Sequence, residues 1–225
     1  MISKNEMKEE LVKSLLGKKV VAIVRGFVPE TCLRLAEAYA EGGIGFVEVT
    51  FNQRDSGTWK DTAAAIRSIT SHFGDVMHVG AGTVLTAEQL GICEQAGGEY
   101  IITPNVNPEL IRECVRRGLV AMPGALTPSE IETAYESGAE VVKVFPAGSL
   151  GTGYIKAIKA PLSHIPLMAV GGVSPDNAAD FIAAGCVGVG VGSNLTNKEW
   201  IAAGEYGKIM AEARRLVEAC KGSGS

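Results

Sequence analysis

The chain has 225 residues, of which 46% are hydrophobic and 20% are charged. This length and composition are typical of one globular domain and exclude a disordered chain. A net charge of −4, with no apolar run of membrane-spanning length, gives no basis for a nucleic-acid or membrane partner.

Short apolar runs rich in Val and Ile recur along the chain, and each predicts a β-strand. The runs are apolar at consecutive positions, which is typical of strands buried on both faces in a parallel sheet. The eight expected strands are Val20–Val24, Phe46–Phe51, His78–Val84, Tyr100–Thr103, Leu119–Met122, Val141–Phe145, Leu167–Val170 and Val187–Val191.

Helical spacing fills the segments between these runs, and capping residues mark the expected helix ends. A capping side chain followed by proline predicts a helix start at Asn107-Pro108, Thr127-Pro128 and Ser174-Pro175. Glycines that suit a left-handed residue at a helix end are Gly42, Gly97, Gly118, Gly138 and Gly185.

Eight βα units in a chain of this length predict a (β/α)8 TIM barrel, preceded by an extra helix over Glu6–Leu16. A doubly wound open sheet is the alternative, but no GxGxxG follows the first strand. We expect a single domain over residues 1–221. The Gly-Ser stretch over 222–225 is typical of a linker or cloning scar.

The cysteines and histidines predict neither disulfides nor a metal site. The five cysteines are scattered and lack a CxxC pair, and the three histidines lack HxxxH spacing. Reduced thiols, together with a polar first segment that lacks a secretion signal, predict a cytoplasmic protein.

Two ionisable residues interrupt apolar strands: Glu48 in 46-FVEVTF-51 and Lys143 in 141-VVKVF-145. They belong to the second and sixth strands, so they can share one layer of the barrel interior. The spacing alone allows a structural ion pair or a lysine that extends to solvent. Because functional groups in such barrels lie at the carboxyl ends of strands, the location favours a catalytic pair.

Glycine-rich loops follow the last two strands, at 171-GGV-173 and 190-GVGSN-194. Phosphate groups commonly bind there in this fold, held by backbone N–H groups and a helix N-terminus. The alternative is that the glycines only make tight turns. The residues expected to bind phosphate are Gly171, Gly172, Gly192 and Ser193.

The motifs at the strand ends, taken together, resemble a known family. They are 22-AIVRG-26, 47-VEVTFN-52, 80-GAGTVLT-86, 102-ITPN-105, 123-PGALTPSE-130, 143-KVFPA-147 and 170-VGGV-173. In this order they are similar to the 2-keto-3-deoxy-6-phosphogluconate/4-hydroxy-2-oxoglutarate aldolases. The resemblance implies a homotrimeric barrel and a class I aldolase that needs no metal or other cofactor.

The resemblance also implies roles for single residues. Lys143 forms a Schiff base with the keto acid, and Glu48 shuttles protons. The reaction releases pyruvate and, from a phosphorylated substrate, glyceraldehyde 3-phosphate; 4-hydroxy-2-oxoglutarate is a further expected substrate. The residues expected to contact substrate are Arg25, Asn52, Thr83, Pro104 and Val170.

Two positions depart from the gluconate pattern of this family. Many members carry arginine where this chain has Asn52, and threonine where it has Val170. Arg25 stands at the first strand end instead, where a guanidinium can bind a carboxylate through two hydrogen bonds. These three residues resemble the 6-phosphogalactonate branch of the family.

Two alternatives come from other functional classes. The first is a catalytically silent trimeric barrel that serves as an oligomeric scaffold, and the presence of both Lys143 and Glu48 argues against it. The second is a metal-dependent phosphosugar epimerase, which needs His and Asp ligands at the strand ends. The sequence has none there.

Overall fold

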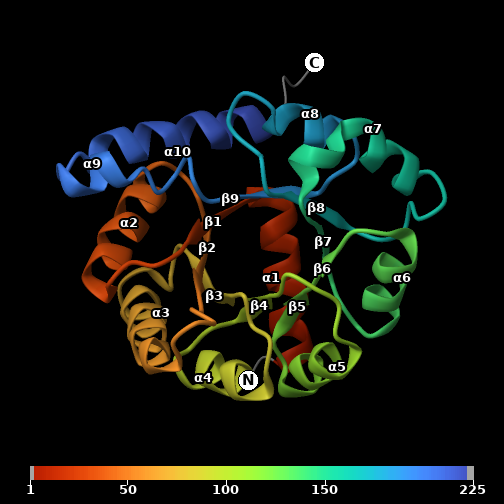
Figure 1. The fold of residues 1–225 in the computed structure, drawn as a ribbon, viewed down its shortest axis with the longest axis horizontal. Coiled ribbons are helices and arrows are strands. Elements are labelled where there is room, and N and C mark those ends of the chain that lie inside the picture. Colours follow the sequence, from red (N-terminus) through yellow and green to blue (C-terminus); the bar gives the residue numbers. More distant parts are fainter. Residues whose placement is uncertain (1–2, 222–225) are drawn as a thin grey trace.

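The computed structural model describes residues 3–221, which form a ring of parallel strands surrounded by helices (Figure 1). The Gly-Ser stretch over 222–225 lies outside the described residues. The strands are β1 Val20–Val24, β2 Phe46–Thr50, β3 His78–Gly82, β4 Tyr100–Ile102, β5 Val120–Met122, β6 Gly124–Ala125, β7 Val142–Val144, β8 Leu167–Val170 and β9 Gly188–Val191. The helices are α1 Lys4–Lys18, α2 Pro29–Glu41, the 3-10 helix η1 Ser56–Thr58, α3 Trp59–Phe73, α4 Ala87–Gln95, α5 Pro108–Arg117, α6 Pro128–Glu136, α7 Ala147–Lys159, α8 Ala178–Ala183, α9 Lys198–Ala202 and α10 Tyr206–Lys221.

The strands pair in the order β5-β4-β3-β2-β1-β9-β8-β7-β6, and each neighbouring pair is parallel. The two ends of this order, β5 and β6, are consecutive in the chain and separated only by Pro123. Proline has no amide hydrogen, so the pairing changes there from β4 to β7. The predicted eight-stranded barrel is therefore confirmed, with its fifth strand split in two.

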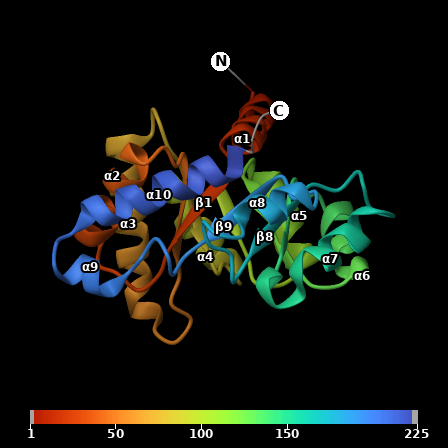
Figure 2. The same ribbon diagram turned by 90° about the horizontal axis from the view of Figure 1, so that it is seen from above.

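Helix α1 closes one end of the barrel. Figure 1 shows it across the bore behind the strands, and Figure 2 shows it projecting from that end. Ser3 and Glu6 start the helix with a capping box. Leu11 and Leu15 are buried among the inward-facing residues of the strands. The expected extra helix is thus present, and it seals the end where the strands begin.

Alternate residues along each strand face opposite sides and create two hydrophobic clusters. The larger cluster lies between the strands and the outer helices and includes Val47 and Val49. The smaller cluster fills the bore and includes Phe46, Tyr100 and Met168. An ionisable side chain that faces inward on a strand therefore meets the apolar interior of the barrel.

Two of the three predicted helix starts are confirmed. Asn107 caps α5, and Thr127 caps α6 through a capping box. Ser174 does not cap a helix, because α8 begins only at Ala178. The side chain of Asn177 accepts a hydrogen bond from the Ser174 amide at 2.8 Å, which holds the chain in a turn first.

Four of the five predicted helix-end glycines have positive φ angles, and Gly42 does not. Gly42 has φ −78°, and the left-handed residue is Gly43 at +90°. A Cβ on Gly42 would lie 2.5 Å from the Cβ of Ala213 in α10. The site requires glycine because two helices approach closely there, a reason that is invisible in the local sequence.

Candidate active site

Glu48 and Lys143 lie at the middle of β2 and β7 and face the barrel interior. The valines on either side of each residue belong to the outer cluster, so the alternation of the strand turns the charged side chains inward. Only 2% of Glu48 and 7% of Lys143 is exposed. The fold thus places a carboxyl group and an amine in the same apolar bore.

Burial shifts the pKa of both groups. It raises the pKa of Glu48 to about 7, although the charges of Lys143 and Arg25 act in the opposite direction. Burial also lowers the pKa of Lys143, an effect that Glu48 opposes and Arg25 reinforces. Because each group shifts the other's pKa, the two titrate as a coupled pair. The lowered pKa of Lys143 favours the free amine, which is the nucleophilic form.

Gly82 in β3 leaves the space that the Glu48 carboxyl group occupies. A Cβ at this glycine would lie 2.4 Å from Oε1 of Glu48, closer than atoms can pack. The other oxygen, Oε2, is buried and accepts no hydrogen bond from the described residues. That oxygen is therefore available to take a proton from a group that enters the bore.

Phe145 covers Lys143 at the end of β7. The Nζ atom lies 4.8 Å from the centroid of the Phe145 ring, within cation–π range. An edge of the same ring lies against Gly171, where a Cβ would approach Cε2 of Phe145 to 3.0 Å. Phe145 therefore lies beside both the amine and the glycine loop after β8. Although Phe145 lies inside the KVFPA motif, the sequence suggested no role for it.

Arg25 and Thr83 meet at the ends of β1 and β3. The Nη2 atom of Arg25 donates a hydrogen bond to Oγ1 of Thr83 at 3.1 Å. Thr83 has a φ of +56°, which is uncommon for a residue with a branched side chain. Gln53 supports it by donating to its carbonyl oxygen at 2.6 Å. Two of the predicted substrate-contacting residues are thus brought together by tertiary contact.

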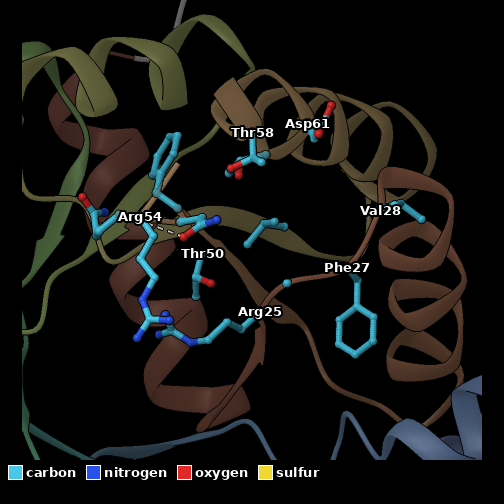
Figure 3. A pocket seen from close by; sticks show the side chains of 13 residues that line it. Arg25, Phe27, Val28, Thr50, Arg54, Thr58 and Asp61 are labelled. Carbon is cyan, nitrogen blue, oxygen red and sulfur yellow. Dashed lines mark hydrogen bonds between the residues drawn. The ribbon is translucent and has the colours of Figure 1, made fainter. Parts of the chain in front are cut away.

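A pocket of about 670 Å³ adjoins the buried pair, between the loops that follow β1 and β2 (Figure 3). Arg25, Thr50, Asn52 and Arg54 line it, whereas neither Glu48 nor Lys143 does. Thr50 is the next residue after Glu48 on the same face of β2, so the pocket begins where the buried pair ends. The lining also includes Val49 and Phe51 of the outer cluster, so the pocket lies beside the buried pair and reaches between β2 and α3.

Asn52 and Arg54 are joined through the backbone of the loop after β2. The Oδ1 atom of Asn52 accepts a hydrogen bond from the Arg54 amide at 3.0 Å. The Asn52 carbonyl oxygen accepts one from Nε1 of Trp59 at 2.9 Å. The predicted substrate residue Asn52 thus also shapes the loop that presents Arg54. Sequence reasoning missed Arg54, although its position just after a strand end was a usable signal.

The two glycine loops lie side by side, because Val170 of β8 pairs with Gly190 of β9. Gly171 and Gly172 have φ angles of +86° and +74°. A Cβ on Gly172 would lie 3.0 Å from the Cα of Gly148. A tight turn and a close backbone approach thus account for glycine at both positions.

The second glycine loop contains Gly192 and Ser193, and Ser193 is exposed. Helices α8 and α9 begin only at Ala178 and Lys198, so no helix N-terminus directly follows either loop. The N-terminus of α7 instead lies against the first loop, where the Gly148 amide donates a hydrogen bond to the Gly171 carbonyl oxygen at 2.7 Å. The expected helix contribution to phosphate binding therefore stays a prediction, beside the backbone amides and the Ser193 hydroxyl.

Val170 and Pro104 occupy different surroundings. Val170 is 3% exposed and belongs to the cluster inside the bore. Pro104 is exposed beyond β4, and a Cβ on Gly124 would lie 2.8 Å from its carbonyl oxygen. Neither residue lines the pocket. Val170 thus offers an apolar wall near the site, whereas Pro104 packs against the split fifth strand.

Within residues 3–221, no group of three His, Cys, Asp or Glu side chains could hold a metal ion. The five cysteines are free and buried. None of the described helices is both long and apolar enough to span a bilayer.

Comparison with known proteins identifies the family. The family model described as KDPG and KHG aldolase matches residues 11–212. The abbreviations stand for the 2-keto-3-deoxy-6-phosphogluconate and 4-hydroxy-2-oxoglutarate aldolases. The chain is 42% identical to the 2-dehydro-3-deoxy-6-phosphogalactonate aldolase of Escherichia coli, over 78% of this chain and 83% of that protein.

Two solved structures support the same assignment. One, titled "Native KDPGal structure", has a TM-score of 0.81 and 37% identity, covering 90% of this chain and 94% of the other. The second is a KDPG aldolase from Legionella pneumophila with pyruvate captured as a covalent carbinolamine intermediate. It has a TM-score of 0.80 and 26% identity, covering 91% and 97%. The chain therefore belongs to the KDPG and KHG aldolase family and is an aldolase, a lyase that cleaves carbon–carbon bonds.

Proposed function

We propose that the chain is a class I aldolase that cleaves a 2-keto-3-deoxy-6-phospho sugar acid to pyruvate and glyceraldehyde 3-phosphate, using Lys143 as the nucleophile. The observation that carries the proposal is the buried pair of Lys143 and Glu48, with a lowered lysine pKa. The carbinolamine named for the Legionella relative supports it, because such an adduct forms when an amine adds to a keto group. No comparison supports the silent-scaffold alternative.

The first half of the reaction forms the imine. The free amine of Lys143 adds to the C2 carbonyl carbon of the keto acid, and the hydroxyl of the adduct takes up a proton from solvent and leaves as water, which gives a protonated imine. This cation next to C3 attracts the electron pair of the C3–C4 bond. The buried surroundings of Lys143 lower the pKa of the amine and so favour its uncharged form before the addition.

The second half breaks the carbon–carbon bond. Oε2 of Glu48 takes the proton of the C4 hydroxyl, the C3–C4 electrons move into the imine, and the aldehyde leaves. The enamine that remains takes a proton at C3 from Glu48. Water then hydrolyses the imine, which releases pyruvate and restores both residues. A carboxyl group with a pKa of about 7 suits both proton transfers near neutral pH.

The substrate contacts follow from the position of Lys143. Arg25 and Thr83 adjoin the pair and bind the carboxylate of the keto acid, and Asn52 contacts the substrate from the pocket. Pro104 is proposed as a further substrate contact from the end of β4. At the other end of the substrate, backbone amides of the two glycine loops and the Ser193 hydroxyl bind the phosphate. The residues assigned to phosphate are Gly171, Gly172, Gly192 and Ser193.

The galactonate epimer is the preferred substrate in this proposal. The combination of Arg25, Asn52 and Val170 supports this choice, as does the 42% identity to a galactonate aldolase. The same chemistry extends to 4-hydroxy-2-oxoglutarate, which lacks the phosphate. We also propose that the protein is a cytoplasmic homotrimer, on the basis of its family resemblance; light scattering of the purified protein tests the trimer.

Borohydride trapping tests the nucleophile. Incubation with pyruvate and borohydride reduces the imine, so one pyruvate-derived mass is expected on the peptide that carries Lys143. The Lys143→Ala variant is the control and should remain unlabelled. A label on any other lysine in the wild-type enzyme overturns the assignment.

A further inference from the structure

Two arginines converge in the pocket beside β2. Arg25 follows β1, and Arg54 lies in the loop between β2 and η1. Figure 3 shows their side chains pointing toward one another. Long exposed side chains of like charge normally turn apart, because their mutual repulsion is relieved in water. Their convergence marks a place where an anion is favoured.

No acidic side chain neutralises this pair of arginines. Among residues 3–221, several arginines form ion pairs, such as Arg116 and Arg215, but neither Arg25 nor Arg54 does. Asp61 is the one acidic residue that lines the pocket. It lies on α3, away from both guanidinium groups in Figure 3. The positive charge between the two arginines is therefore available to a ligand.

The loop holds Arg54 in a defined place. Asn52 accepts a hydrogen bond from the Arg54 amide, and its carbonyl oxygen accepts one from Trp59. Asp55, the next residue, accepts one from the Gly57 amide at 2.9 Å and caps η1. Because hydrogen bonds fix the loop on both sides of Arg54, its side chain is presented to the pocket with little loss of backbone freedom on binding.

The geometry of the proposed reaction identifies which anion fits. In a 2-keto acid the C1 carboxylate is bonded to the C2 carbon that Lys143 attacks, so it must lie beside Lys143. The 6-phosphate lies at the opposite end of the carbon chain. Arg25 adjoins the catalytic pair, because it directly follows β1, whose Ile23 is paired with Glu48 of β2, and it hydrogen-bonds to Thr83 at the end of β3. An anion held by Arg25 is therefore the carboxylate.

We infer that Arg54 is a second ligand of the substrate carboxylate and forms with Arg25 a two-arginine clamp. This inference rests on the proposed function. Two planar guanidinium groups can each donate paired hydrogen bonds to carboxylate oxygens. Arg54 contacts the substrate but takes no part in bond breaking. It strengthens binding of the carboxylate beside Lys143 and selects keto acids over neutral ketones.

Exchange of the methyl protons of pyruvate with deuterium tests the clamp. Pyruvate has a carboxylate but no phosphate, and its exchange through the enamine needs only the imine at Lys143 and the acid–base group. NMR measures the exchange rate against pyruvate concentration for the wild type and for Arg54→Gln, Arg25→Gln and Arg54→Lys. Arg67→Gln is the matched control, because Arg67 is an exposed arginine on the neighbouring α3 outside the pocket.

Arg54→Gln should raise the half-saturating pyruvate concentration about tenfold or more, as expected for lost hydrogen bonds to a charged group. The maximal rate should change less than about threefold. The half-saturating concentration of Arg54→Lys should lie between those of Arg54→Gln and the wild type. Lysine keeps the positive charge but cannot donate the paired hydrogen bonds of a guanidinium group. Arg67→Gln should match the wild type.

Normal pyruvate saturation in Arg54→Gln, with an active wild type, overturns the clamp and leaves the proposed function intact. A defect confined to phosphorylated substrates also overturns it, by assigning Arg54 to the phosphate. A wild-type enzyme that neither exchanges pyruvate protons nor is labelled at Lys143 overturns the proposed function, and the clamp with it.

Discussion

The two ends of the barrel differ in whether their charged side chains form ion pairs. We call the carboxyl ends of the strands, with Arg25, Glu48, Arg54 and Lys143, the mouth. We call α1 and the amino ends of the strands the floor. At the mouth, none of these four residues is in an ion pair within the described chain. Their charges are placed for a ligand.

At the floor, two pairs of ionisable side chains contact each other. Lys8 of α1 forms an ion pair with Glu140, which precedes β7. His78 of β3 contacts Glu99 at 2.5 Å through Nδ1 and Ser14 of α1 at 3.1 Å through Nε2. These contacts join α1 to the barrel. The contacts that stabilise the barrel and the groups proposed for its chemistry therefore lie at opposite ends, as is general for this fold.

The largest expected effect is the loss of the proposed nucleophile at the mouth. Lys143→Met keeps the side-chain volume but removes the amine, so turnover should fall by more than about 10⁴-fold. The free energy of unfolding should stay the same or rise, because a buried polar group outside any ion pair is replaced by an apolar one. Aldol cleavage assays and urea denaturation measure the two. A large loss of stability would show that Lys143 also stabilises the fold, and would contradict the contrast between the two ends.

A matched substitution at the floor should lower stability and leave turnover nearly unchanged. Leu15 of α1 is fully buried against the residues that fill the bore. Leu15→Ala should therefore lower the free energy of unfolding by about 2–5 kcal/mol. Turnover of the folded enzyme should remain within about twofold. Leu16 on the same helix is 42% exposed, and Leu16→Ala serves as the control, with a small expected change. Loss of turnover in folded Leu15→Ala would show that the floor also shapes the site.

Glu48→Gln tests whether Glu48 transfers the protons at the mouth. The variant keeps the shape of the side chain but cannot accept the proton, so turnover should fall at least about 10²-fold, or about 3 kcal/mol. Imine formation with pyruvate should persist. In the wild type, cleavage should rise with pH through about 7, as Glu48 ionises. Near-normal turnover of the variant would assign proton transfer to another group.

The same residue predicts how stability depends on pH. The pKa of Glu48 is raised from 4.5 to about 7 on folding, so the folded state binds the proton more tightly than the unfolded chain. Its contribution to stability is therefore present below pH 4.5 and is lost as the pH rises to about 7. Relative to Glu48→Gln, the wild type should become less stable across this range in urea denaturation. Parallel curves would contradict the burial argument.

The smallest expected effect concerns an uncharged residue at the mouth. Val170→Thr adds a hydroxyl group beside the site, which can hydrogen-bond one C4 epimer. The preference between the galactonate and gluconate substrates should shift toward gluconate by up to about tenfold, or about 1.4 kcal/mol. Competition assays with both epimers measure the ratio. An unchanged ratio would show that Val170 does not contact the C4 centre.

The eight barrel strands, their order and their approximate limits were predictable from the sequence, because buried parallel strands leave local apolar runs. The sequence also singled out Glu48 and Lys143, since a charge inside such a run is rare. The starts of α5 and α6 were predictable for the same reason, as capping depends on residues a few positions apart.

Features that depend on contacts between distant residues became visible only in the folded structure. The fifth strand splits at Pro123 because its two halves pair with different neighbours. Gly42 is required by Ala213 of a helix near the other end of the chain. Arg54 meets Arg25 only because β1 and β2 are paired in the barrel. Local patterns record burial and capping, but they contain no information on which distant side chains will meet.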